Sequence, residues 1–146
     1  MKILVDADGC PVKNIIVKVA KEYNIPVIMF TDTSHLIDDG YSKVVTVGKG
    51  LDSVDFALIN NVNKGDIIVT QDYGLATMAL SKKSYAINQN GLIYTNENID
   101  RLLFQRYLYR KTRKAGGKTV NPKKRKKDDN QRFEKSLRNL IANIIV

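Results

Sequence analysis

Residues 1–12 read MKILVDADGCPV, a short apolar run that ends in two aspartates, a glycine and a proline. The run KILV at 2–5 is rich in branched side chains, which predicts a buried β-strand. Pro11 suits the first position of a helix, with Asp8 or Gly9 near the cap. The opening therefore predicts a strand followed by a helix, with Asp6 and Asp8 at the carboxyl end of the strand.

The same alternation of strand and helix continues along the chain. Further strands are expected at 26–30, 43–47, 66–70 and 85–88, with a short hairpin partner at 92–94. Helices are expected at 11–23, 51–62 and 75–80, and from a cap at Asn96 or Asn98 to about Arg110. Strands that alternate with helices, and that carry apolar runs, predict an α/β fold. We expect three layers, with a mostly parallel sheet of about five strands.

The end of the chain departs from this alternation. Residues 115–127 read AGGKTVNPKKRKK, whose glycines, proline and lysines predict a mobile loop. Residues 128–146 then carry an apolar stripe at helical spacing, which predicts an amphipathic helix. That helix must pack either on the domain itself or on a second subunit, so a homodimer stays open. At 146 residues, the whole chain suits a single domain.

The net charge of +9 is distributed unevenly. Residues 1–100 carry 9 basic and 12 acidic side chains, whereas residues 101–146 carry 15 basic and 3 acidic ones. A strongly basic end predicts a polyanionic partner, and we expect RNA. The candidate nucleic-acid-binding residues are Arg106, Arg110, Lys111, Arg113, Lys114, Lys118, Lys123, Lys124 and Arg125.

Two tyrosines lie among these cations. Tyr107 and Tyr109 both suit stacking on unpaired bases. Tyr107 also continues the stripe of Ile99 and Leu103, and on that count we expect it in the core.

Other classes of site are excluded by composition. Cys10 is the one cysteine, so there is no internal disulfide and no thiol cluster for zinc. His35 is the one histidine and is expected in a surface loop, with general-base duty as the alternative. No leader or membrane-spanning run is found in the sequence, which predicts a cytoplasmic protein with no membrane partner.

Acidic side chains follow several predicted strands at the point where each strand ends. Asp6 and Asp8 follow the first strand, and Asp72 follows the fourth. Asp52 and Asp55 open the helix after the third strand and share one face of it. Because ligands of open parallel sheets bind outside the carboxyl ends of the strands, we expect these acids to gather there.

Clustered carboxylates raise one another's pKa unless a cation neutralises them. Hard divalent ions take oxygen ligands of this kind, so the sequence predicts Mg²⁺ or Mn²⁺ as the cofactor. The expected metal ligands are Asp6, Asp8, Asp52, Asp55 and Asp72, with the choice between Asp52 and Asp55 left open. Four of them, Asp6, Asp8, Asp55 and Asp72, are the expected catalytic residues.

Each of these acids taken singly also fits a helix cap, and for Asp52 and Asp72 a cap alone would explain the residue. Asp32, just past the second strand, lies at the same edge, whereas Asp66 lies at the wrong end of its strand. Thr70 precedes Asp72 by two positions and is expected to support the site. Its hydroxyl suits a bond to a carboxylate or a phosphate, and its branched side chain equally suits the core.

Four motifs together resemble the YaiI/YqxD family of uncharacterised bacterial proteins: DADGCPV, GLDSVD, GDIIVTQDYGLA and NQNG. The resemblance spans nearly the whole chain, and the family is grouped with PIN-like domains. It implies a PIN-like (Rossmann-like) fold similar to that of metal-dependent ribonucleases. Asp6 would then be the first-strand acid, Asp52 or Asp55 the helix acid, and Asp72 the acid of the T-x-D motif.

Three functions follow from these observations. The first is a Mg²⁺- or Mn²⁺-dependent nuclease that hydrolyses phosphodiester bonds, with RNA as the expected substrate. The second is a phosphatase, because DADG resembles the start of haloacid-dehalogenase-type enzymes. Asp6 would then be the nucleophile, with Lys49 or Lys64 beside it. The third is a binding protein without chemistry, which holds RNA or a ribosome-associated partner.

Overall fold

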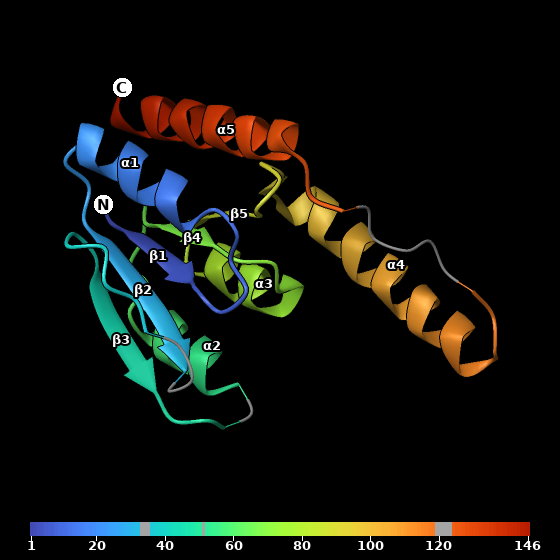
Figure 1. The fold of residues 1–146 in the computed structure, drawn as a ribbon. Coiled ribbons are helices and arrows are strands. Elements are labelled where there is room, and N and C mark those ends of the chain that lie inside the picture. The colour runs from blue at the N-terminus through green and yellow to red at the C-terminus, as the bar shows by residue number, and fades with distance from the viewer. Residues whose placement is uncertain (33–35, 51, 119–123) are drawn as a thin grey trace.

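The computed structural model describes residues 1–32, 36–50, 52–118 and 124–146. Within these residues, the chain forms one sheet of six strands and five helices, four of which cover the sheet (Figure 1). The strands are β1 (Ile3–Asp6), β2 (Val27–Asp32), β3 (Lys43–Val47), β4 (Ile67–Val69), β5 (Tyr85–Ile87) and β6 (Ile93–Tyr94). The helices are α1 (Lys13–Glu22), α2 (Ser53–Asn60), α3 (Tyr73–Ser81), α4 (Asn96–Lys114) and α5 (Lys127–Ile145).

The strand order is β3-β2-β1-β4-β5-β6, and five strands run parallel. The sixth, β6, pairs antiparallel with β5, as expected of the hairpin partner. The chain winds outward from β1 to β3 on one side and from β4 to β6 on the other. The boundary between β1 and β4 is therefore the switch point where ligands of such sheets bind.

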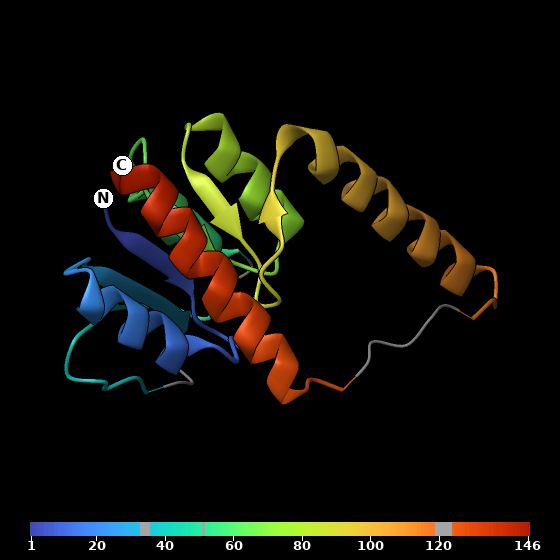
Figure 2. The same cartoon turned by 90° about the horizontal axis from the view of Figure 1, so that it is seen from above.

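Alternate side chains of each strand enter two separate cores, because successive residues point to opposite faces of a sheet. Ile3 and Val5 of β1 pack with α1 and α5, while Leu4 packs with α2 and α3. Figures 1 and 2 show α1 and α5 on one face and α2 and α3 on the other. The predicted α/β fold of three layers is confirmed.

The predicted bounds of α1 and α4 are wrong. α1 begins at Lys13 rather than at Pro11, because residues 7–10 first close a turn in which Cys10 N–H donates to Ala7 O at 3.1 Å. The Lys13 ammonium then donates to Cys10 O at 3.0 Å, which ties the helix to that turn. α4 is capped by Thr95 and runs on to Lys114, beyond the predicted end.

The cap of α4 explains its start. Thr95 Oγ1 accepts from Asn98 N–H at 3.1 Å, and Asn98 Oδ1 accepts from Thr95 N–H at 2.9 Å. This reciprocal pair satisfies two backbone donors that the helix leaves without partners. Beyond the first turns, α4 leaves the body of the domain (Figure 2). Tyr107 is consequently 55% exposed and stacks on Phe104, so its expected place in the core is wrong.

α5 returns across the sheet and buries its apolar stripe within the same chain, against α1 (Figure 2). Its side chains Phe133 and Leu137 are fully buried. Ser136 Oγ donates to Gly91 O at 2.7 Å, which fixes the helix to the turn between β5 and β6. No helix among the described residues is long and apolar enough to cross a membrane.

Candidate active site

The switch point is bridged by a hydrogen bond between β1 and the end of β4. Thr70 Oγ1 donates to Asp6 Oδ2 at 2.9 Å and accepts from Asp72 N–H at 3.0 Å. Thr70 is buried, with 2% of its surface exposed. The Thr70 oxygen accepts from the Asp72 amide, and the single proton of its hydroxyl is directed at Asp6. Of the two uses expected for the Thr70 hydroxyl, the structure thus shows the bond to a carboxylate.

Asp8 is held in the same manner from the other neighbouring strand. Thr31 Oγ1 donates to Asp8 Oδ1 at 2.5 Å, and Asp32 N–H donates to Asp8 Oδ2 at 3.2 Å. Thr31 is fully buried. Thr31 was not predicted from the sequence, although a signal was available. It precedes Asp32 at the end of its strand, much as Thr70 precedes Asp72 by two positions.

The two acids that open helices differ in their hydrogen bonds. Asp72 caps α3, because its Oδ1 accepts from Leu75 N–H at 3.0 Å. Asp52 occupies the cap position of α2 but its side chain makes no capping bond, and its φ of 61° is left-handed. A cap is therefore a real role of Asp72 and not of Asp52. Asp66 lies at the opposite edge, where it pairs with Lys2 at 2.6 Å.

Two adjoining hollows open at this edge. The first, which we call the acidic hollow, has a volume of about 360 Å³ and is lined by Asp6, Asp8, Gly9, Gln71, Asp72 and Arg106. The second, the flanking hollow, has a volume of about 370 Å³, and its charged lining residues are Asp8, Asp32, Lys49, Asp52 and Asp55. Asp8 lines both. The five predicted metal ligands thus line two hollows that adjoin at Asp8.

Burial and neighbouring carboxylates raise the pKa of two of these acids. The pKa of Asp6 is raised, mainly by burial and then by the charges of Asp72 and Asp8, although the Thr70 hydroxyl opposes the shift. The pKa of Asp55 is raised to about 6, again mainly by burial, followed by the charges of Asp72, Asp6 and Asp52. The charges of Asp6, Asp8, Asp52 and Asp72 thus reach Asp6 or Asp55, which places these five acids in one electrostatic environment.

The donor set suits a hard divalent cation, since it consists of carboxylate oxygens without thiol or imidazole. Within the described residues, no group of three or more His, Cys, Asp or Glu side chains is close enough to hold one ion. Mg²⁺ does not need such a cage, because it is usually held by one or two carboxylates, water and substrate phosphates. The residues therefore fit a partly hydrated ion.

The predicted basic residues fall into three groups. Most are exposed on α4 or just beyond it: Arg106, Arg110, Lys111, Arg113, Lys114 and Lys118. Lys124 is exposed and Lys123 lies outside the described residues, as do His35 and Leu51. Arg125 is engaged within the protein, with bonds to Asn130, Asn90 and the carbonyl of Gln89 at 2.7–2.8 Å. Arg125 thus fastens the start of α5.

Gln71 and Tyr73 are further residues that the sequence analysis missed. Gln71 Nε2 donates to Gly9 O at 3.3 Å, and its side chain lines the acidic hollow. The Arg106 guanidinium lies over the Tyr73 ring, 5.6 Å from its centroid. Both residues flank Asp72 in the sequence. They line a common polar surface only because α4 packs beside them in the fold.

The two lysines considered for a phosphatase lie at opposite edges. Lys49 lines the flanking hollow beside Asp8. Lys64 stands in the turn before β4, at the far end of the sheet from Asp6. Only Lys49 is therefore near the acids.

Comparison with known proteins gives consistent matches. Residues 4–143 match the family described as "Uncharacterized BCR, YaiI/YqxD family". The "UPF0178 protein" of Ruminiclostridium cellulolyticum is 61% identical over 94% of this chain and 90% of its own length. Those of Clostridium kluyveri and Clostridium tetani are 52% and 51% identical, over 98% and 97% of this chain and 94% and 97% of theirs. No solved structure matches the chain at a significant level.

Proposed function

This chain belongs to the YaiI/YqxD family, and from the acids at its switch point we propose that it is a Mg²⁺- or Mn²⁺-dependent nuclease that hydrolyses RNA. The observation that carries the proposal is the joint lining of the acidic hollow by Asp6, Asp8 and Asp72, on both sides of the β1–β4 boundary. The implied kinship with PIN-like ribonucleases stays a prediction.

The electrostatics of the hollow support a cation. Burial and neighbouring charges raise the pKa of Asp6 and of Asp55, so the ionised cluster is unfavourable without a counter-charge. The Thr70 and Thr31 hydroxyls hold two of the carboxylates in fixed orientations. Such hydrogen bonds from the surroundings are typical of ligands whose geometry is set before an ion binds.

One or two of the carboxylates of Asp6, Asp8 and Asp72 would hold a partly hydrated ion, with Asp52 or Asp55 on the side of α2. When bound, the ion supplies an activated water and neutralises charge on the phosphodiester oxygens. Arg106 lines the same hollow and suits one non-bridging phosphate oxygen. In the metal-free protein the pKa of Asp55 is raised to about 6, mainly by burial and then by neighbouring acids, so its ionised carboxylate would be stabilised by a bound cation.

The exposed cations of α4 support RNA as the substrate. Arg110, Lys111 and Lys114 continue from Arg106 along the helix that leaves the body of the domain (Figure 1). Their charges suit successive phosphates of one strand, and each such contact should steepen the salt dependence of binding.

The first test is calorimetric titration with Mn²⁺ of the wild type and of the Asp6→Asn/Asp72→Asn double variant. Asp38→Asn is the control, because it removes an exposed loop acid that lines neither hollow. We expect binding to the wild type and to the control, and none to the double variant. A labelled RNA should then be cleaved only by the two metal-binding proteins.

The other functions predict different results. A binding protein without chemistry would hold RNA equally well with and without chelator, and would cleave nothing under either metal. A phosphatase would accumulate phosphate on Asp6. Absence of Mn²⁺ binding by the wild type would overturn the nuclease proposal.

A further inference from the structure

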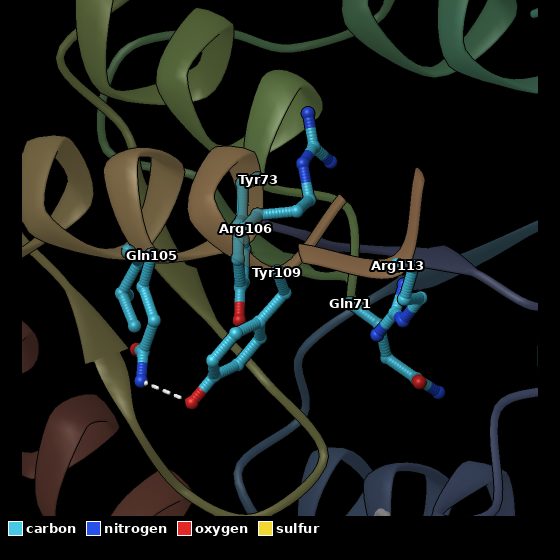
Figure 3. Close-up of a pocket in the computed structure, with 7 residues that line it drawn as sticks. Gln71, Tyr73, Gln105, Arg106, Tyr109 and Arg113 are labelled. Carbon is cyan, nitrogen blue, oxygen red and sulfur yellow. Dashed lines mark hydrogen bonds between the residues drawn. The ribbon is translucent and has the colours of Figure 1, made fainter. Parts of the chain in front are cut away.

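A second pocket lies directly beside the acidic hollow, between α3 and α4, with a volume of about 260 Å³ (Figure 3). One face of α4 contributes Leu102, Gln105, Arg106, Tyr109 and Arg113. Gln71 and Tyr73 line it from the start of α3. The α4 residues follow helical spacing, so they form one stripe that faces α3. We call this pocket the tyrosine pocket.

Both aromatic rings of the tyrosine pocket are held by neighbours. Tyr73 meets the buried Tyr94 edge to face, with ring centroids 6.0 Å apart. Tyr94 in turn donates its hydroxyl proton to Thr70 O at 3.2 Å. On the other side, Gln105 Nε2 donates to the Tyr109 hydroxyl at 2.8 Å (Figure 3). The rings are therefore preorganised, which lowers the entropy lost when a ligand stacks on them.

The chemistry of the lining favours a nucleotide. Tyrosine rings stack on any base, and the guanidinium groups of Arg106 and Arg113 suit phosphate. The amides of Gln71 and Gln105 suit the polar edge of a base. The volume is below the ~300 Å³ at which pockets for drug-sized ligands begin, which favours one base over a large cofactor.

The tyrosine pocket and the acidic hollow adjoin, because Gln71 and Arg106 line both. A base in the one would bring its neighbouring phosphate to Arg106 and toward Asp6 and Asp72. A paired base is stacked inside a helix and cannot enter a recess between two α-helices. The expected occupant is therefore unpaired.

We propose that the tyrosine pocket binds an unpaired nucleotide of single-stranded RNA, adjacent to the phosphate placed in the acidic hollow. As a statement about the substrate it rests on the proposed nuclease function. Binding of the base, however, needs neither metal nor cleavage. The two proposals therefore give separate results in EDTA.

The test is RNA binding in EDTA at fixed salt, with a short single strand that carries 2-aminopurine and with the matching duplex. We expect tighter binding of the single strand, and quenching of the 2-aminopurine when it stacks. Tyr109→Ala should weaken binding about fivefold or more, as expected for the loss of one stacked base, and should abolish quenching. Tyr109→Phe should keep the quenching, because it retains the ring.

Tyr107→Ala is the matched control. Tyr107 lies on the same helix and is exposed, but it stacks on Phe104 and does not line the tyrosine pocket. We expect this variant to bind and quench like the wild type. Equal effects of the two alanine variants, or equal affinity for duplex and single strand, would overturn the proposal. Failure of the nuclease would instead appear as absent Mn²⁺ binding while the quenching persists.

Discussion

The Thr70 hydroxyl lies 2.9 Å from Asp6 Oδ2 and joins the two halves of the sheet at their boundary. The same oxygen accepts from Asp72 N–H, so one buried group sets the position of two acids. Since a hydroxyl has a single proton, this arrangement fixes the direction of its bond to Asp6. Thr70 is thus a positioning residue for the acidic hollow.

We expect Thr70→Val to weaken Mn²⁺ binding about tenfold or more. Valine has nearly the same shape but leaves both Asp6 Oδ2 and Asp72 N–H without their partner, which costs about 1–3 kcal/mol in a buried setting. Calorimetry measures the affinity, and urea unfolding measures the accompanying loss of stability.

Thr70→Ser is the control for this prediction, because it keeps the hydroxyl and removes only a methyl group. We expect its Mn²⁺ affinity to stay near that of the wild type, although its stability should fall by about 1 kcal/mol. If Thr70→Ser and Thr70→Val lower the Mn²⁺ affinity equally, the hydrogen bond is not what orients Asp6.

The fold could be predicted from the sequence because each apolar run or helical stripe shows which residues of its own segment are buried. The run at 43–47 is strand β3 with the predicted bounds. Predictions failed where a preceding turn or the course of a helix decided the outcome. The turn closed by Ala7 and Cys10 delays α1, and the projection of α4 away from the body leaves Tyr107 in solvent.

The candidate site was predictable in part for the same reason. Acids at the ends of parallel strands must share an edge, so the sequence alone predicts the gathering of Asp6 and Asp72. The hydrogen bond from Thr31 to Asp8 depends on strand order, because β2 must lie beside β1. The engagement of Arg125 depends on where the turn at Gln89 and Asn90 lies, which no local pattern reports.

We expect Asp55→Asn to stabilise the metal-free protein above pH 6. Burial and the neighbouring acids raise the pKa of Asp55 from 3.8 to about 6 in the folded state. Between these pH values the folded state binds more protons than the unfolded state, so the free energy of unfolding falls as pH rises. The gain should be about 1 kcal/mol or less, because the carboxyl is only half-buried.

Thermal unfolding in EDTA at pH 4 and pH 7.5 measures this effect. The melting temperature of Asp55→Asn should exceed that of the wild type at pH 7.5, and the difference should shrink at pH 4. Asp38→Asn is again the control and should show no such pH-dependent difference. A stabilisation of the same size at both pH values would contradict the electrostatic cause.

We expect Gly91→Ala to destabilise the protein by about 2–4 kcal/mol, because two effects add. The φ of Gly91 is 89°, in the left-handed region that side chains disfavour, and a Cβ there would lie 2.9 Å from Arg132 O. That clash would displace α5. Gly65→Ala is the control, since its φ is 86° but nothing lies within 4 Å of the added carbon. The free energy of unfolding of Gly65→Ala, measured with urea, should fall by only about 1 kcal/mol. Equal losses in the two variants would exclude the clash.

Arg125 and Lys124 are adjacent cations for which we predict opposite consequences. Arg125→Gln removes the guanidinium bonds to Asn130, Asn90 and Gln89 O, so it should lower the free energy of unfolding by about 2 kcal/mol. Lys124→Gln should leave stability unchanged, because the side chain is exposed.

The salt dependence of RNA binding then separates the roles of Arg125 and Lys124. Lys124→Gln should reduce its slope by about one unit if it contacts a phosphate, and Arg125→Gln should not. A reduced slope without a loss of stability in Arg125→Gln would show that its guanidinium serves RNA rather than α5.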